Sequence, residues 1–278
     1  MRRTKAKLYM FSGSNAVLTA RLMLDHKDIE YRNVQMLPGM HAFVLLGLGF
    51  ETMQVPALKI EGRRVQGTRW IARALDELVA ERPLFPADPG RRRAVEDAER
   101  FGEELQDATR RIFYAAARRD RAAYRSVMTA ERSGPKRLLV SMMAPLVVRL
   151  ATGAHRCTDD AAREDLMLLP ERLDQIDAWI DDGLLNAREL NAADFQIAPN
   201  IAAMLFFEDL APLVEGRPAA ALARRVAPHY PGHVPALLPP EWLAPLTPTQ
   251  NSEPEWMLRD ADAVLRAAGL SPSRTPSA

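Results

Sequence analysis

The stretch from Met53 to Glu77 constrains the fold of this chain more than any other. Val55-Pro56 precedes a short apolar run, Ala57–Ile60, and Glu61-Gly62 then has the composition of a tight turn. Arg64–Gln66 follows as a return strand. A proline directly ahead of a core strand is unusual, because it cannot donate a hydrogen bond to a sheet. A turn beside a ligand, with a cis peptide bond, is one place that accepts it.

The apolar period changes from two to that of a helix at Thr68. Trp70, Ile71, Ala74 and Leu75 recur at the i, i+3, i+4 spacing of an amphipathic helix. Upstream, the pattern predicts a strand over residues 5–11, a helix from 14 to about 27 and a second strand over 29–34. The resulting order, β-α-β followed by β-β-α, is that of a thioredoxin-like α+β domain.

The segment around Val55-Pro56 resembles the second half of the thioredoxin-like domain in the glutathione transferase superfamily. In that family the residue before the cis-proline pairs its backbone with glutathione, and a Glu/Gln-Ser/Thr pair holds the γ-glutamyl end. The resemblance therefore implies thiol contacts at Val55, Pro56 and Thr68. Gly67 departs from the pattern, because it stands where the family has an acidic or amide residue.

Ser14 is the candidate catalytic residue. A transferase of this kind must hold a thiol as its thiolate, and free thiols titrate near 8.5. Ser14 follows the first strand and begins the first helix, where a hydroxyl and free N–H groups both favour an anion. It falls on the position of the active-site serine in theta-, delta- and zeta-like members. Ser12 is the fallback, and a simple helix cap is the alternative role of Ser14.

Two further residues are implied by the resemblance. Gly39-Met40-His41 is similar to the Gly-x-His of theta- and delta-like members, whose histidine contacts the glycyl end of glutathione; a solvated loop histidine is an equal alternative. Gln54 falls near a polar contact to the same carboxylate. Tyr9 lies next to the position of the catalytic tyrosine in other members, Met10, and is expected to face away because side chains alternate along a strand.

The rest of the chain is predicted to be helical. We expect a thioredoxin-like domain over 1–81, a proline-rich linker over 82–90, an all-helical domain over 91–270 and a disordered tail over 271–278. One predicted helix starts near residue 91. Three more span 136–152, 159–181 and 195–210, and a last one spans 254–268. Asn191-Ala-Ala-Asp194 predicts a capping box. Phe101, Phe113 and Tyr114 on the long helix are candidate pocket residues. Arg69 and Asp76 are expected to be ordinary surface charges.

Composition excludes several functions. The net charge of +1 gives no overall attraction for nucleic acid or an anionic membrane. The single cysteine, Cys157, rules out an internal disulfide and Cys-x-x-Cys chemistry. Residues 138–148 are apolar but too short to span a membrane, and we expect a buried helix there. The spacing of His229 and His233 around Pro231-Gly232 does not favour a metal site, and no metal is expected.

The resemblance therefore implies a glutathione-transferase-like enzyme, and the composition leads us to expect it in the cytoplasm. Its co-substrate would be glutathione or another low-molecular-weight thiol, and its acceptor a small-molecule electrophile. By the habit of the family it would be a homodimer, and its Ala- and Arg-rich composition favours a bacterial origin. The alternative is a non-catalytic member of the same fold that serves binding or assembly, which Gly67 favours.

Overall fold

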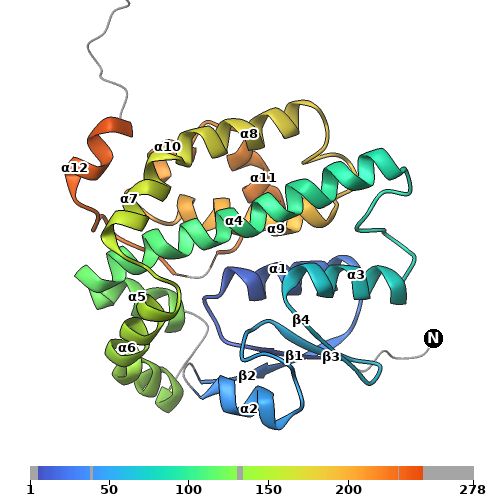
Figure 1. Ribbon diagram of the computed structural model, residues 1–278, viewed down its shortest axis with the longest axis horizontal. Coiled ribbons are helices and arrows are strands. Elements are labelled where there is room, and N and C mark those ends of the chain that lie inside the picture. Colours follow the sequence, from blue (N-terminus) through green and yellow to red (C-terminus); the bar gives the residue numbers. More distant parts are fainter. Residues whose placement is uncertain (1–5, 38–39, 130–133, 231, 247–278) are drawn as a thin grey trace, which may run out of the picture.

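The computed structural model describes residues 6–37, 40–129, 134–230 and 232–246. It has a small mixed α/β domain at the N-terminal end and a larger helical region after it (Figure 1). The elements of the first part are β1 (Ala6–Met10), α1 (Asn15–His26), β2 (Tyr31–Gln35), α2 (His41–Gly47), β3 (Ala57–Ile60), β4 (Arg63–Gln66) and α3 (Thr68–Leu78). The predicted β-α-β, β-β-α order is confirmed.

The four strands form one sheet in the order β2-β1-β3-β4. β1 runs parallel to β2, and both β1–β3 and β3–β4 are antiparallel. Alternation along β1 decides the packing, because Leu8 joins the main core while Tyr9 joins a smaller cluster with Leu45 of α2. In Figure 1, α1 and α3 accordingly cover one face of the sheet and α2 lies on the other.

The helical region is arranged around the long helix α4 and the buried helix α9, which pack against each other. Its elements are α4 (Pro89–Arg119), α5 (Arg121–Thr129), α6 (Gly134–Ala154), α7 (Asp159–Met167), α8 (Leu169–Asp181), α9 (Ala192–Leu205), α10 (Ala211–Val214), α11 (Pro218–Val226), α12 (Pro240–Leu243) and a 3₁₀ turn, Ala244–Leu246. The single helix expected over 159–181 is wrong, because the chain breaks at Leu168. Pro170 has no N–H and its ring obstructs the preceding turn, so it begins a new helix instead.

The capping box of α9 is confirmed. The Asn191 side chain accepts the backbone N–H of Ala193 at 2.9 Å, and Asp194 Oδ2 accepts the N–H of Asn191 at 2.9 Å. Asp194 also accepts the N–H of Asn186 at 2.6 Å. The buried start of α9 therefore has its backbone donors satisfied, as the middle of a core requires.

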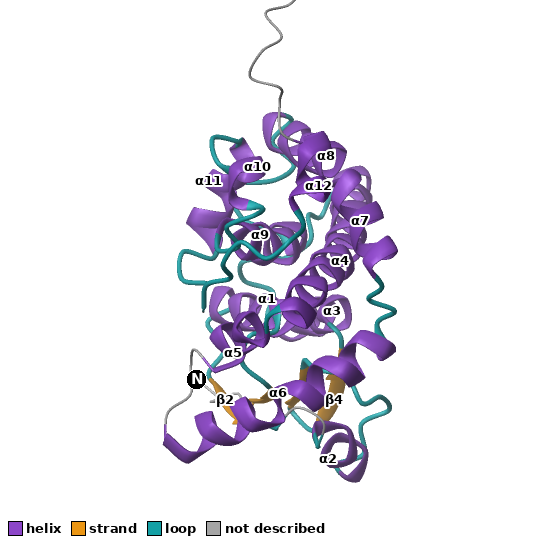
Figure 2. Cartoon of the chain, turned by 90° about the vertical axis from the view of Figure 1, so that its left-hand side faces the viewer, coloured by secondary structure: helices purple, strands orange, loops and turns teal. Residues whose placement is uncertain are grey.

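Helix α6 is not the buried helix that was expected. Its inward side chains Val140, Ala144 and Val148 are buried, but Leu138, Leu139, Met142, Leu146 and Leu150 are exposed. By length and composition alone, Arg137–Ala154 is the one stretch among the described residues that could cross a membrane, and only 17% of it is buried. The view from the side in Figure 2 shows α6 at the edge of the molecule, covered on one side only.

Asp76 and Arg69 are not ordinary surface charges. Asp76 pairs with the buried ammonium of Lys27 at 2.5 Å and accepts the backbone N–H of Leu84 at 2.8 Å. Arg69 lies 3.4 Å from the buried carboxylate of Glu99 on α4, which Arg73 also contacts at 2.8 Å. Arg69 and Asp76 were both misjudged because their charged partners, Glu99 and Lys27, lie 30 or more residues away in the sequence. These contacts tie α3 to the end of α1, to the chain before α4 and to α4 itself.

Two predictions, the last helix over 254–268 and the tail over 271–278, lie outside the described residues.

Candidate functional site

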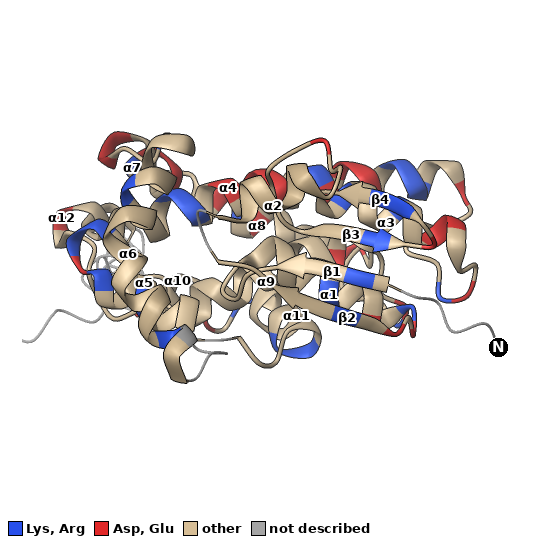
Figure 3. Ribbon diagram, turned by 90° about the horizontal axis from the view of Figure 1, so that it is seen from below, with Lys and Arg blue, Asp and Glu red and all other residues tan. Residues whose placement is uncertain are grey.

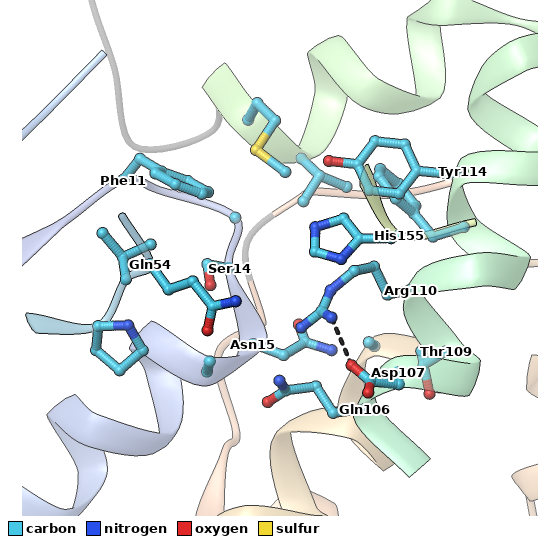
Figure 4. A pocket seen from close by; sticks show the side chains of 18 of the residues that line it. Phe11, Ser14, Asn15, Gln54, Gln106, Asp107, Thr109, Arg110, Tyr114 and His155 are labelled. Atoms are coloured by element: carbon cyan, nitrogen blue, oxygen red, sulfur yellow. Dashed lines mark hydrogen bonds and ion pairs between the residues drawn. The ribbon is translucent and has the colours of Figure 1, made fainter. Parts of the chain in front are cut away.

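An open cavity of about 410 Å³ lies between the two parts of the chain. The N-terminal part contributes Phe11, Gly13, Ser14, Asn15, Ala16, His41, Met53, Gln54, Val55, Pro56, Gly67 and Thr68 to its wall. The helical part contributes Glu103, Gln106, Asp107, Thr109, Arg110, Phe113, Tyr114, Val127, Met128, His155, Ala203, Phe207, Tyr230 and Val234. All seven candidate thiol-site residues therefore line one cavity, with a separate set of side chains opposite them (Figure 4).

Ser14 is the N-cap of α1 and faces this cavity. Its Oγ accepts the backbone N–H of Val17 at a long 3.4 Å, and its backbone is extended, as an N-cap requires. An oxygen that accepts this bond still has its own proton to donate, and no described group accepts that proton. Capping and contact with a ligand are therefore compatible roles.

The start of α1 also offers backbone donors. The N–H groups of Asn15 and Ala16 form no hydrogen bond with any described residue, and both residues line the cavity. The fallback residue Ser12 is buried away from the cavity, where it accepts a hydrogen bond from Gln35 at 3.0 Å. Tyr9 faces the opposite side of the sheet and packs edge-on against Phe50, with ring centroids 5.5 Å apart.

The peptide bond between Val55 and Pro56 is cis, as predicted. The Val55 backbone N–H and C=O form no hydrogen bond within the described chain, and Val55 lines the cavity. A ligand backbone can therefore pair with it. Sequence reasoning missed what holds this loop in place: the Gln66 amide donates to the carbonyls of Thr52 and Gln54 at 2.8 and 3.1 Å, and accepts the Thr52 N–H at 2.8 Å.

Gly67 and Thr68 form the corner between β4 and α3. Gly67 has φ 82° and ψ 145°, a conformation that is essentially restricted to glycine. A side chain there would meet only Trp70, at 3.7 Å from the added Cβ, so space is not the constraint. The backbone conformation therefore explains why position 67 is a glycine, which departs from the pattern of the family that the segment resembles. Thr68 is buried at the first turn of α3 and faces the cavity.

His41 begins α2 beside the cavity. Its ring packs edge-on against Phe11, with ring centroids 5.3 Å apart, so it is not the solvated loop residue of the alternative interpretation. Burial lowers the pKa of His41 below its ordinary value, which favours the neutral ring. A neutral imidazole can donate one hydrogen bond and accept another.

The wall that the helical part forms contains more kinds of polar and charged side chain than the wall around Ser14. Arg110 and Asp107 on α4 form an ion pair, and Figure 4 shows them with Tyr114 and His155 across the cavity from Ser14 and Gln54. Burial raises the pKa of Tyr114 to about 12, so its hydroxyl keeps its proton at neutral pH. Phe113 also lines the wall. Phe101 does not, because it packs against Trp179 with ring centroids 5.0 Å apart.

A chain of hydrogen bonds crosses from one part of the protein to the other behind Ser14. The Tyr230 hydroxyl donates to Asn15 Oδ1 at 2.7 Å, and Asn15 Nδ2 donates to Asn200 Oδ1 at 2.9 Å. Burial raises the pKa of Tyr230, which keeps this donor neutral. No local sequence pattern indicates these partners, which are 185 and 215 residues from Asn15.

Cys157 is buried, and burial raises the pKa of its thiol, so it is not an activated nucleophile. Among the described residues, no three His, Cys, Asp or Glu side chains are grouped so that they could hold a metal ion. No cysteine in the part of the chain that the structure describes lines the cavity.

The first domain matches the model of a known protein family. Residues 8–83 match the family described as glutathione S-transferase, N-terminal domain. The matched segment contains every candidate thiol-site residue. No curated protein sequence matches the chain at the required significance.

Solved glutathione transferases share the fold over 81–97% of this chain. A rice enzyme, solved in complex with glutathione, is 15% identical with a TM-score of 0.56, and the match covers 97% of this chain and 100% of that one. Glutathione transferase F7 from Populus trichocarpa is 16% identical with a TM-score of 0.57, covering 81% and 94%. A glutathione S-transferase from Rhodospirillum rubrum is 17% identical with a TM-score of 0.50, covering 87% and 99%. At these identities the similarity establishes the glutathione transferase fold.

Proposed function

We propose that this protein binds a low-molecular-weight thiol, glutathione or a relative of it, as the thiolate in the cavity between its two parts, and transfers it to an electrophilic small molecule. The observation that carries the proposal is that two kinds of unsatisfied hydrogen-bonding group line the same cavity. The unpaired backbone of Val55 lines the same cavity as the N–H groups and the hydroxyl at the start of α1. The first suits the peptide backbone of a ligand, and the second suits an anion.

Each group has a role in this reaction. The thiol loses its proton to solvent, and Ser14 with the N-terminus of α1 stabilises the resulting thiolate. The sulfur then bonds to an electrophilic carbon, and the leaving group or the adjacent conjugated atom takes the electron pair. His41, Gln54, Pro56 and Thr68 would hold the remainder of the thiol. The α4 wall, with Arg110 and Tyr114, would face the acceptor.

Gly67 favours the second candidate, a non-catalytic binding or assembly protein. A missing charge-assisted hydrogen bond to the γ-glutamyl ammonium would cost about 1.5–3 kcal/mol. That is roughly tenfold or more in affinity for glutathione. The same gap is equally consistent with a thiol that lacks this ammonium group. Theta/delta/zeta-like serine chemistry, a homodimer, a bacterial origin and a cytoplasmic location complete the proposal.

A thermal-shift panel of cellular thiols tests the proposal. A ligand present at a hundred times its dissociation constant stabilises the folded state by about 2.7 kcal/mol. We expect at least one thiol to raise the melting temperature, and the same thiol to be consumed when a model electrophile is added. Stabilisation without consumption would favour the non-catalytic candidate. No stabilisation by any thiol would contradict both the site and its function.

A further inference from the structure

We propose that the exposed apolar face of α6 is a docking surface for an anionic lipid bilayer. The face consists of Leu138, Leu139, Met142, Leu146 and Leu150, and is called the α6 face below. The inference is independent of the thiol chemistry, because it uses no residue of the cavity.

Helix α6 has two apolar sides, and the protein covers one of them. Val140, Ala144 and Val148 recur every fourth residue and are buried where α6 packs against α4 and α5. Leu138, Met142, Leu146 and Leu150 repeat at the same spacing on the opposite side, and the Met142 side chain is 71% exposed. An exposed apolar patch of this kind marks an interaction site more often than chance scatter does.

The end of the molecule that carries α6 has a second apolar element. Met40 and Phe43 of the α2 region are exposed, Phe43 by 78%. Figures 1 and 2 place α2 and α6 at the same end of the molecule. Figure 3, which views that end, shows no acidic residue on either helix. Two separated apolar helices at one end suit a broad, flat partner better than a single peptide segment.

Charge identifies the partner. Residues 121–156 contain seven Lys or Arg and one Glu, in a chain whose net charge is only +1. The whole-chain value therefore conceals a strongly basic segment. Within α6 itself there is no acidic residue, and Arg137 and Arg149 form no ion pair with any described residue. Apolar residues combined with basic side chains are what an anionic bilayer surface attracts.

The same charges argue against a symmetric contact between two copies. In a two-fold interface the same patch meets itself, so two strongly basic segments would face each other. The buried side of α6 also argues for lying on the bilayer rather than spanning it. Crossing would require Val140, Ala144 and Val148 to leave the protein core.

Sedimentation of the full-length protein with vesicles tests the proposal. One set of vesicles contains phosphatidylglycerol and phosphatidylcholine, and the other contains phosphatidylcholine alone. We expect the protein to pellet with the anionic vesicles, to pellet much less with the neutral ones, and to be released by high salt, which screens the attraction. Binding to both sets alike, or to neither, would overturn the proposal.

Variants locate the contact. Met142→Glu/Leu146→Glu is expected to abolish pelleting, because it places two carboxylates on the α6 face. Arg137→Gln/Arg149→Gln is expected to weaken vesicle binding about fivefold per arginine, or ~1 kcal/mol each. The matched control is Leu168→Glu, an exposed leucine between α7 and α8. Unchanged binding of the Met142→Glu/Leu146→Glu protein, with a native near-ultraviolet circular dichroism spectrum, would exclude this face. A chain that fails to bind vesicles but forms a dimer that Met142→Glu dissociates would show that a second copy covers it.

Discussion

At the scale of single residues, Gly67 shows how backbone conformation limits what a sequence pattern can say. Its φ of 82° lies in the region that side-chain-bearing residues rarely adopt. The sequence shows that an acidic or amide partner is missing, but not that the backbone there favours glycine. Placing a carboxylate at position 67 therefore strains the backbone, and the cost of that strain must be measured separately from the effect on ligand binding.

Gly67→Ala and Gly67→Glu form a matched pair for this purpose. Both are expected to lower the free energy of unfolding by about 1–3 kcal/mol, since both force a side chain into a glycine conformation. If the ligand is glutathione, the Glu variant should bind it roughly tenfold or more tightly than the Ala variant, because the carboxylate accepts from the γ-glutamyl ammonium. Calorimetry on the two variants measures the difference. Equal affinities would indicate a thiol without that ammonium group.

Sequence analysis could place those site residues whose position is determined by their neighbours in the chain. Ser14 follows a strand and starts a helix, and Val55-Pro56 precedes a strand, so each position follows from its neighbours in the chain. Asn15 has partners at 200 and 230, and no local pattern marks them. Phe101 was assigned to the pocket from its place in a helical stripe, but the stripe cannot tell which of its members face the cavity.

At the scale of elements, the hydrophobic period predicted where helices occur better than it predicted which of their faces are buried. Helix α6 spans 134–154 against an expected 136–152, but its exposure was missed. An apolar helix with apolar side chains on two faces has the same composition whether one face or both are covered. The sequence does contain a signal for the break between α7 and α8, since Pro170 lies inside the stretch that is predicted as one helix.

The capping box of α9 gives a prediction about pH. Burial raises the pKa of Asp194 from its ordinary 3.8 to about 6, despite the backbone N–H groups of Asn186 and Asn191, which oppose the rise. The folded state therefore favours the protonated carboxyl. Its contribution to stability is fully present below pH 3.8 and is lost as the pH rises through about 6.

Urea unfolding of the wild type and of Asp194→Asn between about pH 4 and about pH 7 measures this contribution. The wild type should lose up to about 3 kcal/mol relative to the variant over that range, at about 1.36 kcal/mol per pKa unit. The variant also loses an acceptor for one N–H, which lowers its stability equally at every pH. A difference between the two proteins that is constant with pH, or that grows in the opposite sense, would contradict the raised pKa.

At the scale of the whole molecule, buried ion pairs connect the first domain to the chain that follows it. The Lys27 ammonium is buried and bonds to Asp76 and to the carbonyls of Val79 and Glu81 at 2.8 and 3.1 Å. Asp76 in turn accepts the N–H groups of Leu84 and Phe85 at 2.8 and 3.1 Å. One carboxylate thus joins α1, α3 and the segment before α4.

Asp76→Ala should therefore be severely destabilising. It leaves a buried ammonium without its carboxylate, which typically costs 3–5 kcal/mol, or about 4 kcal/mol here. The control is Asp97→Ala on α4, which removes an exposed pair with Arg100 and should cost less than about 1 kcal/mol. Chemical unfolding of both variants measures the two losses. Similar losses would mean that the Lys27–Asp76 pair is not what fixes this junction.

The titration of a bound thiol tests most directly whether the start of α1 stabilises it as the thiolate. Ser14→Ala removes one hydrogen bond to a charged group, about 1.5–3 kcal/mol. The pKa of the bound thiol should therefore rise by roughly 1–2 units, with some depression remaining from the helix N-terminus. The control is Thr158→Ala at the start of α7, a second N-cap whose oxygen accepts an N–H at 3.1 Å and which does not line the cavity.

The readout is the ultraviolet absorbance of the bound thiolate against pH, with thermal unfolding of each variant alongside. Both variants should lose about 0.5–2 kcal/mol of stability as cap deletions. Only Ser14→Ala should shift the titration of the thiol to higher pH. If both variants lose stability and neither shifts the titration, Ser14 is only a helix cap and the proposed thiolate site is contradicted.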